Sequence, residues 1–249
     1  MMLKKIVLPL LLLTLFYQAN AQFKGVLKKV DEAKAKVEEK INGSTAALSQ
    51  EEVGNGLKQA LDIGVAEAVD FLSAEDGYYK TAYKILVPED AQKVTSKLKA
   101  IPGWSNVEKT LEEKMNRAAE IAVEKAKPIF VKAIKEMTFQ DAMNILMGEQ
   151  NAATSYLHKT TYQSLFDEFM PVVQASLDEV NAREYWRGAV NAYNKIPFIS
   201  KANPELDQHV TKMALVGLFD LVEKKEASIR TDVSQRKTDL LKKVFAKQD

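Results

Sequence analysis

Asn116, Arg117, Glu120 and Asp141 are the residues of this chain whose types and spacing best suit the chemistry of a polar site. Arg117 and Glu120 are three residues apart, so they can form an ion pair on one face of a helix. One interpretation is a solvated charge ladder, in which each pair contributes roughly a few tenths of a kcal/mol. The other is a polar pocket between helices, in which Arg117 pairs with Glu120 or Asp141 in a poorly solvated place.

A further carboxylate, Asp220, interrupts the apolar run from Met213 to Val222. A segment that is apolar on every side is typical of a central buried helix. Asp220 then either pairs at the surface with Lys224, four residues on, or is a buried carboxylate with a shifted pKa that marks a functional site. The exposed pair is the favoured interpretation.

Familiar catalytic and metal-binding patterns are missing from the sequence. The chain has no cysteine, which excludes thiol redox chemistry, a disulfide framework and a thiolate metal site. His158 and His209 are distant in sequence and form no His-x-x-x-His pair, and there is no Asp-rich calcium loop, phosphate-binding glycine loop or G-x-S-x-G elbow. We therefore predict no catalytic residue, no cofactor and no metal. The formal net charge of +1 gives no reason to expect a nucleic-acid partner.

Caps and prolines indicate the helices that position the polar residues. Ser105 and Glu108 have the spacing of a capping box, and Thr138 offers a second cap with Asp141 in the first turn. Pro128 breaks the helical pattern and suits the first position of the next helix. Three short helices are therefore expected around the polar residues.

Similar signals predict helices along the rest of the chain. Ser49 is expected to cap a helix over about residues 50–72, and Asn203 followed by Pro204 predicts the start of the last long helix. We expect one all-α domain over residues 48–246, built from roughly eight to ten helices.

The N-terminus predicts export. Lys4 and Lys5 precede an apolar run, and Ala19-Asn20-Ala21 is a small-x-small cleavage site, so residues 1–21 are expected to be a signal peptide. The run is short for a membrane span. Residues 22–47 are predicted to form a detachable amphipathic helix and a linker. After cleavage the chain is expected to have no transmembrane span and to be soluble in the periplasm or cell envelope.

An ordered set of motifs resembles one family of exported bacterial proteins, catalogued as domain of unknown function 4197. The motifs are Leu48-Ser-Gln-Glu-Glu, Gly56-Leu-Lys-Gln-Ala-Leu, Met115-Asn-Arg-Ala-Ala-Glu, Pro128-Ile-Phe, Met137-Thr-Phe-Gln-Asp-Ala, Ile145-Leu, Ala152-Ala-Thr-Ser-Tyr and Thr238-Asp-Leu-Leu-Lys-Lys-Val-Phe. The resemblance covers nearly all of the chain after the linker. It implies an all-helical, exported protein and assigns no catalytic residues.

The expected function is that of a non-enzymatic envelope protein that binds a protein partner or a small apolar or lipid-like ligand between its helices. One alternative is an enzyme, such as a hydrolase, that uses Arg117, Glu120 and Asp141. Another is a structural or assembly role for the N-terminal helix. An apolar tunnel would favour ligand binding, whereas a cleft with converging carboxylates would favour catalysis.

We predict that the exported protein begins at Gln22, because the small residues at positions 19 and 21 fit the cleavage site of a signal peptidase. The intact mass of the protein recovered from the cell envelope checks this. A mass that still includes residues 1–21 would contradict the prediction and indicate a membrane-anchored protein.

Overall fold

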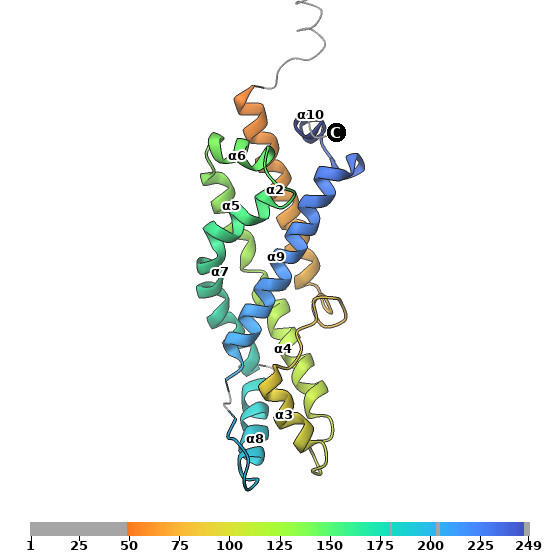
Figure 1. Ribbon diagram of the computed structural model, residues 1–249, viewed down its shortest axis with the longest axis vertical. Helices are drawn as coiled ribbons and strands as arrows, with labels where there is room; N and C mark the ends of the chain where they lie inside the picture. Colours follow the sequence, from red (N-terminus) through yellow and green to blue (C-terminus); the bar gives the residue numbers. More distant parts are fainter. Residues whose placement is uncertain (1–48, 180, 203–204, 247–249) are drawn as a thin grey trace, which may run out of the picture. The chain divides into compact units, whose positions relative to one another are not determined.

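The computed structural model describes residues 49–179, 181–202 and 205–246 (Figure 1). Its elements in chain order are α2 (Gln50–Ser73), α3 (Glu89–Leu98), α4 (Val107–Val123), α5 (Ala126–Glu136), α6 (Phe139–Leu146), α7 (Ala152–Glu179), α8 (Ala182–Asn194), α9 (Asp207–Thr231), the 3-10 helix η1 (Val233–Gln235) and α10 (Asp239–Phe245). These residues contain no strand, so the all-α prediction is confirmed for them. The predicted signal peptide and N-terminal helix lie outside the described residues.

Helices α2, α4, α7 and α9 form the centre of the described domain. Helix α9 contacts the other three, and α4 also contacts α2 and α7 (Figure 1). Helices α5 and α6 pack on α2 and α7, whereas α3 and α8 pack on each other and on α4. None of the helices in this part of the chain combines the length and the apolar character that a membrane span requires.

The apolar face of α4 explains why this helix lies at the centre. Its apolar residues recur every three or four positions and are fully buried: Val107, Leu111, Met115, Ala118 and Ala122. Removing this surface from water stabilises the domain. Asn116 and Glu120, which flank the apolar stripe, are buried with it.

Two of the three predicted caps are confirmed. Ser49 and Glu52 form a capping box at the start of α2, and Thr138 and Asp141 form another at the start of α6. The predicted Ser105–Glu108 box is wrong. Helix α4 begins at Val107 with Asn106 as its N-cap, so Ser105 and Glu108 do not occupy the two positions of a capping box. The Glu108 carboxylate pairs instead with Lys99, just after α3.

Prolines mark helix starts less accurately than expected. Pro128 is not the first residue of a helix, because α5 begins two residues earlier at Ala126; proline is tolerated there because first-turn N–H groups lack partners within the helix. The last long helix begins at Asp207, behind the buried Leu206, and not at Asn203–Pro204. Packing of Leu206 into the domain sets this start, and residues 203–204 lie outside the described part.

Helix α9 is central but is not buried on every side. Met213 is 37% exposed and Val216 is 57% exposed, because α9 packs through its other faces. Asp220 lies on the same open stripe and pairs with Lys224 at 2.6 Å. The expectation of an all-round buried helix is therefore wrong, and the exposed ion pair is the correct interpretation of Asp220.

Helix α10 docks on α2 through Leu241, Val244 and Phe245, which are buried. The contact is close at Gly56, where an added Cβ would lie 2.5 Å from Val244 Cγ2. Valine is stiff at χ1, so this methyl group cannot easily move away. The C-terminal helix is therefore part of the packed domain.

We expect Gly56→Ala to lower the free energy of unfolding by about 1–3 kcal/mol, because it overpacks the α2–α10 contact. Gly54→Ala is the matched control, since an added Cβ there meets no atom within 4 Å. It should stabilise the domain by up to about 1 kcal/mol through helix propensity. Urea unfolding of both variants checks the pair. Equal effects of the two substitutions would contradict close docking of α10.

Candidate functional site

Arg117 lies between two carboxylates, where α4 meets the loop of residues 74–88 that joins α2 to α3. Its Nη1 donates to Glu120 Oε2 at 2.7 Å, and its Nη2 donates to Asp76 Oδ1 at 2.7 Å. The guanidinium also lies 5.5 Å from the centroid of the Tyr79 ring, within reach of a cation–π interaction. The hydrogen bond to Glu120 is the largest of the causes that raise the pKa of Arg117. Hydrogen bonds from Lys80 and then Arg117 lower the pKa of Asp76.

Glu120 is the buried member of this group, with 4% of its surface exposed. Its Oε1 accepts hydrogen bonds from the backbone N–H groups of Tyr78, at 3.1 Å, and Tyr79, at 3.2 Å. Its Oε2 is held by Arg117. The carboxylate is therefore occupied on both oxygens, and it fastens the loop to α4.

Asn116 performs the same task one turn earlier on α4. Its Oδ1 accepts from Ile85 N at 2.8 Å, and its Nδ2 donates to Ile85 O at 2.9 Å. A side-chain amide here pairs with both backbone groups of one residue, as a neighbouring strand would do. Asn116 and Ile85 are both fully buried, so these bonds satisfy groups that water does not reach.

Asp141 has a different position and task. Its Oδ2 accepts from Thr138 N at 3.0 Å and from Thr138 Oγ1 at 2.6 Å, which completes the cap of α6. These bonds lower the pKa of Asp141. The structure thus brings Asn116, Arg117 and Glu120 together around the loop, and it places Asp141 at the exposed start of α6. The solvated charge ladder does not describe Asn116 and Glu120, because both are buried.

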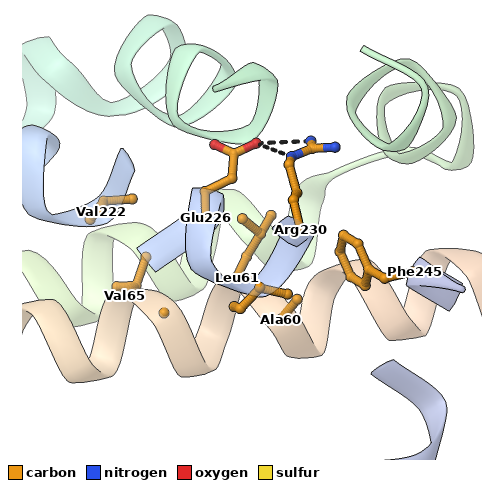
Figure 2. Close-up of a pocket in the computed structure, with 9 residues that line it drawn as sticks. Ala60, Leu61, Val65, Val222, Glu226, Arg230 and Phe245 are labelled. Atoms are coloured by element: carbon orange, nitrogen blue, oxygen red, sulfur yellow. Dashed lines mark hydrogen bonds and ion pairs between the residues drawn. The ribbon is translucent and has the colours of Figure 1, made fainter. Parts of the chain in front are cut away.

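A second buried ion pair, Glu226 with Arg230 on α9, joins the ends of two other helices (Figure 2). Glu226 accepts from the backbone N–H groups of Ala153, at 2.9 Å, and Thr154, at 2.8 Å, at the start of α7. Arg230 Nη2 donates to Ile145 O, at 2.8 Å, at the end of α6. Each side chain therefore carries the charge that the helix dipole favours at that end.

The sequence analysis missed this pair. The available signal was the four-residue spacing of a glutamate and an arginine on a helix that also carries an apolar stripe. That spacing is common on exposed helices, so it does not by itself indicate burial. The adjacent cavity, lined by α2, α9 and α10, has a volume of about 20 Å³ (Figure 2). This is room for about one water molecule and not for a lipid chain.

A larger groove of about 590 Å³ lies where the start of α3, the helix α8 and the start of α9 meet. We call it the α3–α8–α9 groove. Its apolar wall is formed by Pro88, Ala91, Trp186, Tyr193 and Leu206. Its charged and titratable lining residues are Lys93, Lys201, Lys212, Glu205 and His209. Its volume falls in the range of small-molecule sites, roughly 300–1,000 Å³.

The indole of Trp186 is unusual in this wall. The residue is 1% exposed, and its Nε1 has no hydrogen-bond acceptor among the described residues. A buried donor without an acceptor costs about 1–3 kcal/mol, so such groups are rare in native proteins. His209 completes the groove from α9, and its Nε2 donates to Leu86 O at 2.9 Å. That bond ties the first turn of α9 to the segment before α3.

Comparison with known proteins places these features in a family. A family model described as "Protein of unknown function (DUF4197)" matches residues 47–246. The chain belongs to the DUF4197 family. No curated protein and no solved structure matches it. The Arg117 cluster, the Glu226–Arg230 pair and the α3–α8–α9 groove all lie within the DUF4197 region, and residues 1–46 precede it.

In this DUF4197 domain we expect Arg117→Ala to lower the free energy of unfolding by about 2–4 kcal/mol, because it leaves the buried Glu120 carboxylate without its cation. Arg117→Lys should restore only part of this, since an ammonium lacks the planar fork that reaches two carboxylates. Denaturant unfolding with unchanged m-values measures both effects.

Lys127→Ala is the control for this experiment. Its ion pair with Asp70 is long, at 3.9 Å, and both side chains are exposed. Its removal should change the free energy of unfolding by no more than about 0.5 kcal/mol. If Arg117→Ala is as stable as this control, the fastening role of Arg117 is wrong.

Proposed function

We propose that this DUF4197 protein is an exported, non-enzymatic envelope protein that binds a small lipid-like ligand in the α3–α8–α9 groove. Export is supported by the sequence of residues 1–21, with its two lysines, its apolar run and its small-x-small site. Ligand binding between helices is supported by the size and lining of the groove. The observation that carries the proposal is the presence of a wall with buried aromatic residues in a groove of ligand size.

The lining of the groove favours an amphipathic ligand. Trp186, Tyr193 and Leu206 are largely covered by the domain, and their remaining exposed atoms form part of the apolar wall of the groove. Binding sites for small molecules combine such surface with a few polar groups that fix orientation. Here the polar groups lie on Lys201, Lys212 and neighbouring residues. A ligand with an apolar body and a polar end matches both parts.

The use of the other polar clusters supports binding over catalysis. Both oxygens of Glu120 are occupied by backbone donors and Arg117, and the Glu226 carboxylate is occupied by α7 and Arg230. A general base or nucleophile must be able to reach a substrate. These groups instead hold a loop and two helix ends, which is a structural use. In the described part, no cluster of histidine and carboxylate side chains is placed to hold a metal ion.

We expect decanol or decanoate to bind one molecule per chain, measured by calorimetry below the concentration at which the amphiphile self-associates. Ala202→Phe should weaken this binding by about ten-fold or more, because a phenyl ring at position 202 enters the groove. The backbone bonds of Ala202 to Asn194 remain available, at 3.0 Å and 3.3 Å, so the loop should keep its position.

Ala175→Phe on the exposed surface of α7 is the matched control, and it should leave the affinity within about two-fold. Circular dichroism establishes that both variants are folded. The proposal fails if neither decyl compound binds, or if Ala202→Phe and Ala175→Phe bind equally well.

A further inference from the structure

The lining of the α3–α8–α9 groove carries more positive than negative charge. Three lysines line it, Lys93, Lys201 and Lys212, and one carboxylate, Glu205. The nearby Asp207 carboxylate is used elsewhere, because it accepts from Gln174 at 3.1 Å and lies 3.6 Å from Arg183 Nε. Clefts lined by one sign of charge concentrate ligands of the opposite sign.

Two helix N-termini meet at this groove. Helix α3 starts behind Pro88 and α9 starts behind Leu206, and neither residue provides a side-chain cap. The first N–H groups of a helix and the helix dipole both favour an anion. The bond from His209 Nε2 to Leu86 O, at 2.9 Å, holds the two starts side by side. His209 donates through Nε2 because a backbone carbonyl can only accept.

An independent observation comes from Trp186. Its Nε1–H is a donor without an acceptor in the described structure, on a side chain that forms part of the groove wall. Indole is a donor only, so the group that would satisfy it must carry an acceptor such as a carboxylate or phosphate oxygen. The lysines and the helix starts favour an anion, and the indole needs an acceptor, which the oxygens of an anionic group supply.

We propose that the α3–α8–α9 groove selects an amphipathic anion, with a carboxylate or phosphate at the two helix starts and an apolar body along Trp186 and Tyr193. This inference rests on the proposed ligand-binding function and adds the charge of the ligand. Lys201 and Lys212 attract the anionic group, and Trp186 Nε1 donates to one of its oxygens. A neutral alcohol of the same length gains the apolar contact and a hydrogen bond to its hydroxyl oxygen, but no attraction to the lysines.

The test uses three probes with the same decyl chain: decanoate, decanol and decyltrimethylammonium. Calorimetry on the intact domain should give an affinity for decanoate at least about ten-fold higher than for the other two. The preference should fall as sodium chloride is added, because salt screens the attraction. Inorganic phosphate alone should bind more weakly than decanoate, since it lacks the apolar body.

Nuclear magnetic resonance gives a second readout from the indole itself. The chain has two tryptophans, so Trp104→Phe leaves one indole N–H signal and identifies that of Trp186. Decanoate should move this signal downfield, as expected when Nε1 gains a charged acceptor, and decanol should move it less.

Variants separate the headgroup from the chain. The double variant Lys201→Ala, Lys212→Ala should weaken decanoate binding by about ten-fold and leave decanol within about two-fold. Lys109→Ala, on the exposed side of α4, is the control for loss of charge and should have no effect on either. Equal binding of all three decyl probes would overturn the anion selection and leave the proposed function intact. Binding of inorganic phosphate as tightly as decanoate would overturn the amphipathic part. Failure of all three decyl probes to bind would overturn both proposals.

Discussion

The loop of residues 74–88 sets the main constraint on this domain. It forms no regular helix, yet Tyr78, Ile85 and Val87 within it are buried. Backbone N–H and C=O groups in such a segment need partners inside the protein, because water does not reach them. Helix α4 supplies these partners through Asn116 and Glu120, and Arg117 neutralises the buried carboxylate. The aromatic ring of Tyr78 completes the attachment, since its hydroxyl donates to Ala214 O on α9 at 2.8 Å.

The same loop leads directly into α3, so its attachment also positions the groove. Leu86 O accepts a hydrogen bond from His209 Nε2, and Pro88 is part of the apolar wall of the groove. Asn116, Arg117 and Glu120, which the sequence suggested as a site, therefore do not line the groove themselves. They hold the segment that forms one side of it. A polar cluster in a helical domain can thus be important for binding without touching a ligand.

The sequence predicts features that depend on residues close together in the chain better than features that depend on contacts between distant segments. The caps at Ser49 and Thr138 depend on residues within one turn, and the structure has them as predicted. The cap at Ser105 was wrong because α4 starts one residue later, with Asn106 as its N-cap. The suggested pairing of Asp141 with Arg117 was wrong, because the Asp141 carboxylate accepts from Thr138 in the cap of α6.

The groove could not be predicted, because its lining comes from separate segments. Pro88 starts α3, Trp186 lies in the middle of α8, and Leu206 precedes α9. Helical spacing relates Trp186 to Tyr193 on one face of α8, but it says nothing about which helix covers them. Aromatic residues on one face of a helix more often belong to the packed core. Here Trp186 and Tyr193 are packed in the domain and also line the groove. The resemblance of the chain to its family could not help either, because the family carries no assigned site.

The buried Glu226–Arg230 ion pair and the buried Arg236 side chain fix the ends of several helices. The Glu226–Arg230 pair connects the start of α7 to the end of α6. Arg236 follows α9 and η1 in the chain, and its Nε donates to Ile229 O in the last turn of α9 at 3.1 Å. Such pairs contribute little net stability, because desolvation of the charges offsets their attraction. Their geometric demand is strict, however, since each donor must meet a particular carbonyl or carboxylate. The ends of α6, α7 and α9 are held together in this way, beside the cavity of about 20 Å³ that α2, α9 and α10 line. The α3–α8–α9 groove lies elsewhere in the domain, where α3 and α8 pack on α4 and the first turn of α9 completes the wall.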